Sequence, residues 1–511
     1  MKIQMQKNTC KRHIATEIVL SIFMFLGYLT FFSAMWYKLV YGDVGFDAIL
    51  FTLFGNTSGV ESDLVVQYLI NSLLPALLCS GITYFLLIFR SPKAFVLEGF
   101  KQTFKIYPLN RIFGSIISLT LSAALIFTAC NLSGLNNYIY SRWQTTEIYE
   151  NYYVSPEQVS INFPGKKRNL IYIYLESMET TFTSKNLGGG GSNNAIPELH
   201  NLANENINFS SNDGVGGFHS PYGTTWTTGG MVAQTSGINL NISANMHNNT
   251  VPGQQEEFLP GVTSLNDILH DNGYYQTLMV GSDAVFGERK KYFLTHEVDR
   301  IYDLLTARQE GFIPKDYSVW WGMEDKKLFD YAKLKLTEIA NDTSRPFNFT
   351  MLTADTHHIG GYICKDCKHD FSEQYENVLS CSSKHVNDFV EWIKQQLFYE
   401  NTTIIICGDH PTMDYGYIRR NIDSKYTRVV YNCIINSAIS ANKSKQRNIT
   451  SFDLFPTTLA SLGCTIEGDR LGLGTNLFSD KDTLLEKFGD TDSLNKELAK
   501  HSKYYKEHFL D

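Results

Sequence analysis

The chain has 511 residues, of which 43% are hydrophobic and 19% charged, and its formal net charge is -8 at pH 7. A chain of this length is expected to form two or three structural units rather than one small domain. Its acidic balance, and the lack of a long basic run after the apolar N-terminal third, argue against a protein that binds nucleic acid, because phosphate backbones are recognised by clustered lysine and arginine.

Three apolar stretches in the N-terminal third approach the roughly 20 residues that a helix needs to cross a bilayer. We expect membrane-spanning helices at about residues 14–37, 65–89 and 112–129, since the backbone groups of a bilayer segment must be satisfied within a helix. The stretch Phe46–Phe54 is too short to span and is typical of an interfacial or re-entrant segment. The first apolar run is long and has no persuasive small-residue cleavage site after it, so we do not expect a cleaved signal peptide.

The charges that flank these stretches alternate in sign. The N-terminus and the second loop are rich in lysine and arginine. The first loop is acidic, with Asp43, Asp47, Glu61 and Asp63. Because cytoplasmic loops are enriched in lysine and arginine, three crossings leave the chain after Asn131 outside the cytoplasm. We therefore expect a multi-pass protein of a bacterial inner membrane with a large periplasmic domain.

The rest of the chain, after a membrane domain of residues 1–131, divides into three parts. Residues 132–168 are polar and tyrosine-rich without clear periodicity, which indicates a linker or a juxtamembrane helix. In residues 169–480, apolar β-rich runs alternate with stretches of helical spacing. This alternation predicts an α/β domain with a mainly parallel central sheet that is covered on both faces. Residues 481–511 are expected to form a helical tail.

Three of the apolar runs end in acidic or imidazole side chains. NLIYIYLES ends at Glu176, FNFTMLTADTHH at Asp355 and His357, and TTIIICGDH at Asp409 and His410. Ligands of parallel sheets lie beyond the carboxyl ends of the strands, so these side chains are candidates for one site. Oxygen donors mixed with an imidazole suit manganese, magnesium or zinc. Taken singly, each acid could instead cap a turn between a strand and a helix.

The segment SPYGTTWTTGGMVAQTSGINL is dense in Ser, Thr and Gly and contains several possible nucleophiles. It could be a loop that leads into a helix capped by Thr227 or Thr228. The N-terminus of that helix would also present free N–H groups to a phosphate. A metal ion on one of the hydroxyls would lower its pKa, so a helix start and a nucleophile are compatible here.

Three cysteines, Cys364, Cys367 and Cys381, are clustered in a polar segment. A disulfide between two of them is the favoured expectation in an oxidising compartment. A zinc site would need a fourth ligand, which His369 or His385 could supply. Free thiols are the third alternative.

Five segments together resemble one known family. LESMETTF, TTWTTGGMVAQTSGINL, TADTHH, CGDHP and DLFPTTLASLG are similar to segments of the phosphoglycerol transferases that decorate periplasmic glucans. These enzymes are relatives of the lipoteichoic acid synthases in the sulfatase/alkaline-phosphatase superfamily. The resemblance covers about residues 169–478 and implies an alkaline-phosphatase-like domain. It also implies the transfer of phosphoglycerol from phosphatidylglycerol to a sugar hydroxyl of a glucan, with release of diacylglycerol.

The resemblance assigns roles to individual residues. It implies that Thr225 is the nucleophile, with Thr224 as the nearest rival, and that a phosphoglycerol-threonine ester forms during the reaction. It further implies that Glu176, Thr225, Asp409 and His410 hold a manganese ion, for which magnesium or zinc could substitute. In the same comparison, the segment that contains the nucleophile is distinguished by its tryptophan, Trp226, which is a candidate contact to the substrate.

Two histidines and one further segment are implied as substrate contacts. His357 resembles the family histidine that contacts the headgroup or protonates the leaving oxygen, and the neighbouring His358 could take that part. GSDAVFGERKKYF stands where lipoteichoic acid synthases surround the glycerol phosphate with a His, a Trp and an Arg. A glycine replaces that histidine here, which argues against polymer synthesis. The residues carried over are Asp283, Phe286 and Arg289, although Arg289 could also belong to a surface charge run with the two lysines that follow.

Other functions remain as alternatives. A phosphoethanolamine transferase acting on lipid A or another glycan is the first of them, and a metal-dependent hydrolase that passes the headgroup to water is the second, because it shares the first chemical step. A sulfatase would carry a C/S-x-P-x-R motif where TTWTT stands in this chain. A binding protein with a degenerate site is disfavoured because every position that the metal requires is filled by a competent residue.

Overall fold

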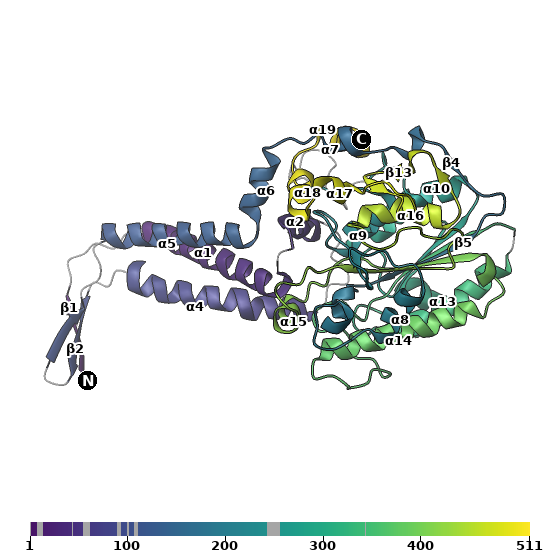
Figure 1. Cartoon of the computed structure of the whole chain (residues 1–511). Helices are drawn as coiled ribbons and strands as arrows, with labels where there is room; N and C mark the ends of the chain where they lie inside the picture. The colour runs from purple at the N-terminus through teal and green to yellow at the C-terminus, as the bar shows by residue number, and fades with distance from the viewer. Residues whose placement is uncertain are drawn as a thin grey trace. The chain divides into compact units, whose positions relative to one another are not determined.

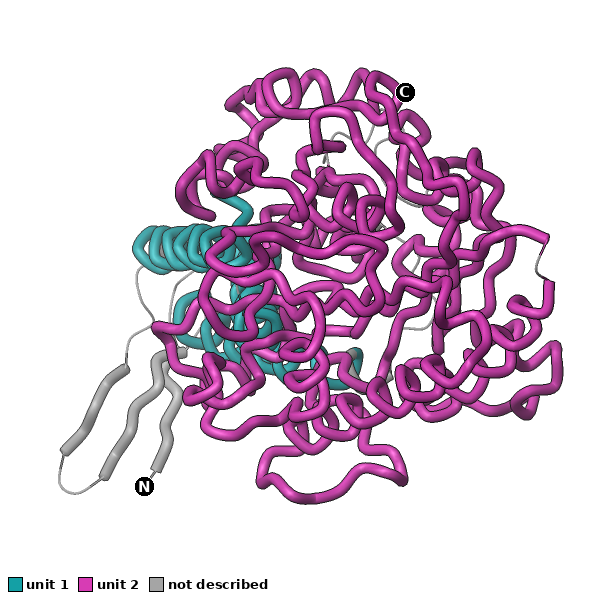
Figure 2. Tube along the Cα trace, turned by 45° about the vertical axis from the view of Figure 1, so that its right-hand side comes forward, with its two compact units in different colours: residues 1–43, 61–137 teal, residues 44–60, 138–511 magenta. Residues whose placement is uncertain are grey.

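The computed structural model divides the chain into two compact units. One comprises Met1–Asp43 and Glu61–Asn137, and the other Val44–Val60 and Tyr138–Asp511 (Figure 2). The structure describes residues 2–7, 14–42, 44–54, 62–88, 93–99, 102–106, 111–242, 256–342 and 344–510. Two of the acidic residues expected in the first loop, Asp43 and Glu61, lie outside these ranges.

The first unit contains three helices that are long and apolar enough to cross a membrane, Ile14–Tyr41, Val65–Ile88 and Ile112–Leu132. This confirms the three apolar helices that the sequence predicts. The first and third of these spans are α1 (Ile14–Tyr41) and α5 (Arg111–Leu132). The middle span is built from α3 (Ser62–Tyr68), a π-helical turn (Leu69–Leu73), α4 (Leu74–Thr83) and a second π-helical turn (Tyr84–Ile88). Pro75, in the first turn of α4, has no N–H for the preceding turn, which accounts for the first irregularity.

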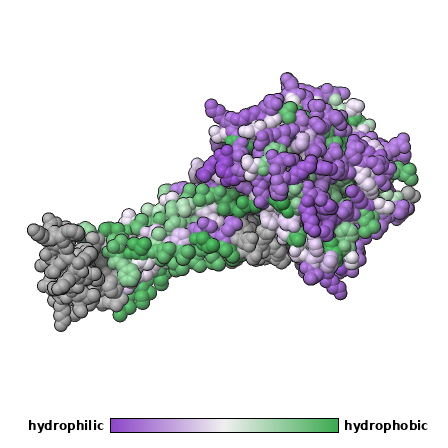
Figure 3. Space-filling view, turned by 90° about the horizontal axis from the view of Figure 1, so that it is seen from below, coloured by the Kyte–Doolittle hydropathy of each residue, from purple (hydrophilic) through white to green (hydrophobic). Residues whose placement is uncertain are grey.

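The surface of these helices is apolar. Ile22, Phe85 and Phe113 are each more than half exposed. Figure 3 shows hydrophobic side chains on the surface of this unit, whereas the surface of the second unit is mostly hydrophilic. Between the helices, small residues permit close contact, because a Cβ added at Gly27 of α1 would lie only 3.2 Å from the Cα of Ser122 in α5. Three strands, β1 (Lys2–Lys7), β2 (Lys93–Gly99) and β3 (Gln102–Ile106), form an antiparallel sheet that the sequence analysis did not anticipate.

The second unit is built on a seven-stranded sheet in the order β6-β11-β10-β5-β9-β7-β8. Five neighbouring strands are parallel: β10 (Thr402–Gly408), β5 (Asn169–Leu175), β9 (Phe347–Leu352), β7 (Tyr275–Val280) and β8 (Arg300–Tyr302). At one edge, β11 (Val430–Ile435) and β6 (Gly217–Phe218) continue the sheet in antiparallel fashion. The mainly parallel sheet that the alternating pattern predicts is therefore confirmed.

Helices cover both faces of this sheet, as Figure 1 shows. On one face lie α8 (Pro197–Glu205), α13 (Asp325–Asn341) and α14 (Gln374–Lys394). On the other lie α9 (Thr227–Ser236), α10 (Leu265–Asp271) and α16 (Leu454–Ser461). The central strands are consequently buried on both sides, and Ile171, Phe349 and Ile404 are fully inaccessible. Other short helices are α11 (Arg289–Thr295), α12 (Leu304–Gln309) and α15 (Tyr415–Asn421). Two pairs of short strands lie outside the main sheet, β4 (Ile161–Asn162) with β12 (Thr465–Ile466) and β13 (Arg470–Leu471) with β14 (Gly474–Thr475).

Most of the expected linker and the whole expected tail belong to this second unit. After α6 (Leu135–Arg142), the chain forms α7 (Ile148–Tyr152), and the C-terminal residues form α17 (Leu484–Phe488), α18 (Thr491–Leu498) and α19 (Lys503–Phe509). Tyr149 is buried, and its ring contacts Tyr505 and Phe509 of α19. Tyr138 and Tyr149, which help to make this stretch look polar, thus bury their rings, because a tyrosine combines a large apolar face with one polar group.

The short apolar segment before the second span is also part of this unit. It forms α2 (Phe46–Phe54), which buries Ala48, Leu50 and Phe51. The Phe51 ring lies 5.8 Å from the ring of Trp226, the residue that precedes α9. α2 is therefore packed against the folded domain near the start of α9, a placement that its length and hydrophobicity did not reveal.

Candidate active site

The two acids expected to meet are brought together by strand register. β5 and β10 are parallel neighbours in which Leu175 is paired with Gly408, so the residues that follow them, Glu176 and Asp409, leave the sheet side by side. Both side chains are buried, with exposed fractions of 3% and 0%. β9 ends at the same edge on the other side of β5 and leads into the segment of His357. The carboxyl ends of three adjacent strands therefore supply the candidate site.

Ser177 joins the two acids and was missed by the sequence analysis. Its hydroxyl donates a hydrogen bond to Glu176 Oε1 (2.8 Å), and its backbone N–H donates to Asp409 Oδ1 (2.8 Å). The residue has a φ of 56°, a left-handed conformation that a side chain other than glycine adopts at a cost of about 1–3 kcal/mol. This strained turn after β5 directs both donors at the two carboxylates, and only its position in LESME hinted at such a role.

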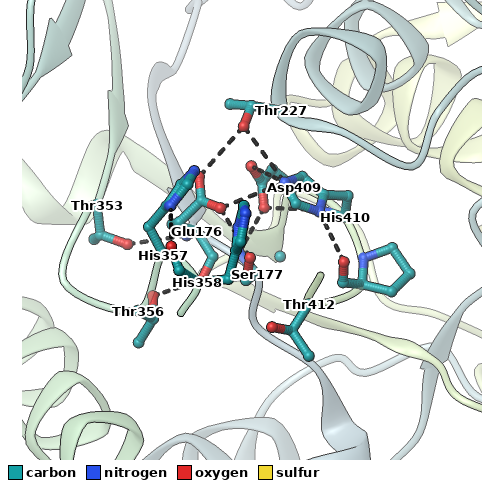
Figure 4. Close-up of polar contacts among 12 residues, drawn as sticks. Glu176, Ser177, Thr227, Thr353, Thr356, His357, His358, Asp409, His410 and Thr412 are labelled. Atoms are coloured by element: carbon teal, nitrogen blue, oxygen red, sulfur yellow. Dashed lines mark hydrogen bonds and ion pairs between the residues drawn. The ribbon is translucent and has the colours of Figure 1, made fainter. Parts of the chain in front are cut away.

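Four side chains of the site turn donor atoms toward one another (Figure 4). His410 Nε2 lies 3.4 Å from Glu176 Oε1 and 3.4 Å from Asp409 Oδ2. The Thr227 hydroxyl lies 3.4 Å from Glu176 Oε2 and 3.4 Å from His410 Nε2. Ligands about 2.1 Å from a tetrahedral ion are about 3.4 Å from one another, so the spacing fits a single divalent cation.

The charges of the cluster also fit a cation. Asp409 Oδ2 is buried and accepts no hydrogen bond from the part of the chain that the structure describes, which is costly for a carboxylate without a compensating cation. Burial and the neighbouring Glu176 charge raise the pKa of Asp409. Burial alone would also raise the pKa of Glu176, but His357 and His410 lower it below its usual range. Two acids in one dry site are stabilised by a positive ion between them.

The His410 ring is oriented as a ligand. Its Nδ1 lies 2.8 Å from the carbonyl oxygen of Pro411, and because a carbonyl can only accept, Nδ1 carries a hydrogen and Nε2 faces the acids. Burial would lower the pKa of His410, but Asp409 and Glu176 outweigh it and raise that pKa to about 9. The same field that attracts a proton to Nε2 would attract a metal ion there.

The threonine that contacts this cluster is Thr227, not Thr225. Thr227 is the first residue of α9, whose N-cap is Trp226, so neither Thr227 nor Thr228 serves as the cap that the sequence suggested. The Thr224 hydroxyl donates to the carbonyl oxygen of Pro221 (2.8 Å) and is fully buried. Thr225 lies in the loop before the helix and is half-buried. The start of α9 decides which hydroxyl meets the acids, and it brings Thr227 there rather than Thr224 or Thr225.

His357 and His358 follow β9 and stack on each other, with ring centroids 4.4 Å apart. His357 Nδ1 lies 2.8 Å from the carbonyl oxygen of His358, which leaves Nε2 as the atom able to exchange a proton with a substrate. Burial lowers the pKa of His357, and the Glu176 carboxylate opposes that effect. Burial also lowers the pKa of His358, with His357 adding to the effect. Both imidazoles are thus favoured in the neutral form beside Glu176.

The segment after β7 places one arginine close to the acids. Arg289 is only 6% exposed, so it is not part of a surface charge run, whereas Lys290 is exposed. Its guanidinium donates to Ser282 Oγ (2.9 Å) and to the carbonyl oxygen of Phe286 (2.9 Å). Burial lowers its pKa to about 10, while Glu176 and Asp283 act in the opposite direction, so it stays cationic at neutral pH. The Asp283 carboxylate itself accepts from the N–H of Val285 at 2.9 Å.

An aromatic residue absent from the sequence-based candidates lies between this segment and the histidines. The Trp321 ring is 5.2 Å from Phe286 and 4.5 Å from His357. Phe286 is also the ring over which the Arg289 guanidinium lies, at 5.7 Å. Trp321 was missed because it stands in the irregular stretch YSVWWGMED, far in sequence from every motif; its one signal was a pair of tryptophans in a polar context.

A buried ion pair holds the segment that follows His410. Glu179 is fully buried and accepts hydrogen bonds from Arg428 and, at 2.8 Å, from the N–H of Thr412. Arg428 also donates to the carbonyl oxygen of Thr412 at 2.7 Å. The pair thereby fixes the backbone two residues beyond His410.

We expect Arg428→Met to lower the free energy of unfolding by about 3 kcal/mol, because it leaves the Glu179 charge buried without its partner. Arg420→Met is the matched control: its pair with Glu373 is exposed, at 58% and 32% for the two side chains, and its loss should change stability by less than about 0.5 kcal/mol. Denaturant-induced unfolding of the purified variants measures both. Equal effects of the two substitutions would contradict the buried role of Arg428.

Comparison with known proteins places this site in a family context. The Sulfatase family model matches residues 168–464, more than half of the chain. Phosphoglycerol transferase I of Xanthomonas campestris pv. campestris is 31% identical over 257 residues, which is 48% of this chain and 34% of that protein. Phosphoglycerol transferase I of Escherichia coli is 30% identical over 275 residues, 52% of this chain and 33% of that protein. The chain thus spans about a third of the length of these relatives.

Solved structures with a similar chain trace include a lipoteichoic acid synthase and an integral membrane protein. The lipoteichoic acid synthase LtaP of Listeria monocytogenes has a TM-score of 0.47 and 18% identity, covering 63% of this chain and 79% of that chain. The lipooligosaccharide phosphoethanolamine transferase A (EptA) of Neisseria meningitidis has a TM-score of 0.48 and 12% identity, covering 88% of this chain and 84% of that chain.

Proposed function

The chain belongs to the sulfatase family, and we propose that it transfers phosphoglycerol from phosphatidylglycerol to a hydroxyl of a periplasmic glucan. The observation that carries the proposal is the Thr227 hydroxyl, held 3.4 Å from both Glu176 and His410 at the start of α9. The proposal that the transferred group is phosphoglycerol rests on the similarity to phosphoglycerol transferase I of Xanthomonas and of Escherichia.

The reaction has two displacements at phosphorus. In the first, the Thr227 hydroxyl loses its proton and Oγ1 forms a bond to the phosphorus of phosphatidylglycerol, while the bond to the diacylglycerol oxygen breaks. That oxygen takes up a proton and leaves as diacylglycerol. In the second, a sugar hydroxyl attacks the phosphoglycerol-threonine ester, loses its proton and releases Thr227. His357 Nε2 is the proposed site of proton exchange with the leaving or attacking oxygen, or of a contact to the headgroup.

The start of α9 supports the first displacement. α9 has ten residues, and its N–H groups at the first turn have no carbonyl within the helix to bond. These groups and the helix dipole favour a phosphate beside Thr227. Arg289 adds a buried positive charge on the side of the β7 segment, and Phe286 and Trp321 provide an apolar wall next to His357.

Glu176, Asp409, His410 and Thr227 are proposed to hold a divalent ion. Three oxygen donors and one imidazole suit manganese, magnesium or zinc, and the choice of manganese follows the family resemblance. When bound, such an ion would lower the pKa of the Thr227 hydroxyl and offset charge on the phosphoryl oxygens. The protein's own contribution is to hold the hydroxyl, the acids and the imidazole in place before the substrate arrives.

The donor is proposed to be a lipid of the membrane that the apolar helices enter. Confining enzyme and phospholipid to one surface raises their effective concentration, while a glucan can arrive from solution. The charge alternation of the loops favours a periplasmic location for the site, in a protein that crosses a bacterial inner membrane three times.

A labelled-lipid assay tests the proposal. The purified full chain is incubated with manganese and phosphatidylglycerol labelled in its headgroup glycerol, with and without periplasmic glucan. We expect release of diacylglycerol and movement of the label to the glucan. Label that appears only as free glycerol phosphate, in either condition, would identify a hydrolase instead. Turnover of phosphatidylethanolamine in place of phosphatidylglycerol would identify the phosphoethanolamine transferase alternative, and turnover of neither lipid would contradict all three.

A further inference from the structure

A second group of metal-binding side chains lies apart from the carboxylate cluster. Cys364 and Cys367 belong to the long loop between β9 and α14, and Cys381 and His385 lie four residues apart on α14, which places them on one face of that helix. Ligand atoms of Cys364, Cys381 and His385 all lie within 4.8 Å of one another. The pattern is C-x2-C from a loop and C-x3-H from a helix.

The sulfur positions match those around a zinc ion. Cys364 Sγ is 3.6 Å from Cys381 Sγ and 3.5 Å from Cys367 Sγ. Thiolates about 2.3 Å from a tetrahedral zinc ion are about 3.8 Å apart, whereas the sulfurs of a disulfide are about 2.05 Å apart. Cys381 Sγ and His385 Nε2 are 4.0 Å apart, close to the roughly 3.6 Å of a sulfur and a nitrogen on one zinc ion. All three cysteines are free thiols in the structure.

His385, and not His369, is the histidine that completes this group. His369 is exposed, whereas the His385 side chain is 13% exposed and faces Cys381. The Asp366 carboxylate lies 3.6 Å from His385 Nε2, which is too long for a hydrogen bond. Asp366 instead pairs with Lys326 at 2.6 Å. His385 Nε2 is therefore available to a metal.

We propose that Cys364, Cys367, Cys381 and His385 bind a structural zinc ion. This ion would attach the loop between β9 and α14, which carries His357, to α14. Three sulfurs and one imidazole are soft donors that select zinc, while the carboxylate cluster offers mainly oxygen. The chain would then hold two metal ions of different chemical class. The disulfide favoured from the sequence alone is replaced by this site.

At this position the zinc ion would stabilise the loop that carries His357 and His358. Roughly 20 residues without regular structure separate β9 from α14, and loops of this length in a compact domain are uncommon unless they are functional. This loop carries His357 and His358 at its start. Beyond them it is held by Gly360 N–H, which donates to Asp414 Oδ2 at 2.8 Å, and by Gln374, which donates to the carbonyl oxygen of Gly361 at 3.0 Å. The zinc ion would add a fastening point in the middle of the loop and so keep the two histidines in position.

Metal analysis of the purified full chain tests the site. We expect zinc at about one equivalent per chain that persists when Asp409→Asn disables the carboxylate cluster, and its loss in Cys381→Ala. Growth with cobalt in place of zinc should give the absorption bands of thiolate-bound cobalt, which the carboxylate cluster cannot produce because it contains no sulfur. His385→Cys should keep the metal, since four cysteines also bind zinc. That variant separates loss of the metal from loss of the fold.

The matched control is Cys464→Ala, which removes a buried thiol outside the cluster and should leave zinc and the cobalt bands unchanged. Hydrogen exchange of residues 359–373 should be faster in Cys381→Ala than in the wild type and in Cys464→Ala. Three results would each overturn the proposal. They are a disulfide among the three cysteines in protein alkylated before lysis, zinc content equal in the wild type and Cys381→Ala, or wild-type protein without zinc and without cobalt bands.

Discussion

Thr227→Ala is expected to lower the rate of diacylglycerol release by at least about 10³-fold, since it removes the only atom of that side chain able to attack phosphorus. Glu176, Asp409 and His410 remain, so the variant should stay folded. The rate is measured with labelled phosphatidylglycerol and manganese. Thr227→Ser keeps a hydroxyl at the start of α9 and should retain part of the activity.

Thr225→Ala is the decisive comparison, because it removes a chemically identical hydroxyl two residues earlier. Thr225 lies in the loop before α9, whereas the Thr227 hydroxyl lies 3.4 Å from Glu176 Oε2 and His410 Nε2. We therefore expect a far smaller effect at Thr225. Mass spectrometry of wild-type protein incubated with the lipid alone should find phosphoglycerol on the peptide of α9. An inactive Thr225→Ala together with an active Thr227→Ala would restore the sequence-based choice.

Gly230→Ala is expected to lower kcat by about 10²-fold, the size of effect that a displacement of about 1 Å has on a positioned nucleophile. A Cβ at Gly230 would lie 2.1 Å from the carbonyl oxygen of Asp409 and 2.9 Å from its carbonyl carbon. These are backbone atoms of the segment that carries Asp409 and His410, and they cannot rotate away. α9 must therefore move away from the end of β10, which separates Thr227 from Asp409 and His410.

The same substitution should destabilise the fold by about 1–3 kcal/mol, as overpacking of a close contact does. Steady-state kinetics and thermal unfolding of the two glycine variants separate the effects. Gly165→Ala is the control, because nothing lies within 4 Å of its added Cβ, and it should change neither kcat nor the free energy of unfolding by a measurable amount. Unchanged turnover in Gly230→Ala would show that the approach of α9 to Asp409 does not position the nucleophile.

The two glycines of TTWTTGGMV therefore matter for more than turn formation. A Cβ at Gly229 would lie 2.6 Å from the carbonyl oxygen of Gly223, so both positions need a side chain of hydrogen alone. Glycine inside a helix costs about 1 kcal/mol relative to alanine. The cost is offset here by an approach of helix to strand that brings a hydroxyl, two acids and an imidazole to one point.

Patterns along the chain determined the fold class of this protein and the place where its acids lie. Length and hydrophobicity are enough for the three apolar helices, because a bilayer leaves few alternatives to a helix. Likewise, alternating apolar runs predict a parallel sheet, and acids at the ends of such runs gather at one edge because parallel strands share a direction. Glu176 and Asp409 meet because, in addition, β5 and β10 are neighbouring strands in register.

Only the tertiary structure decided which threonine joins them, what covers the start of α9 and which histidine completes the cysteine cluster. Thr224, Thr225 and Thr227 are identical in chemistry, and the difference among them is set by the residue at which α9 begins and by its contact with the backbone of Asp409. The packing of Phe51 against Trp226 and the choice of His385 over His369 likewise join residues far apart in sequence. Such contacts depend on how helices pack on the sheet, and no local pattern of residue types records that.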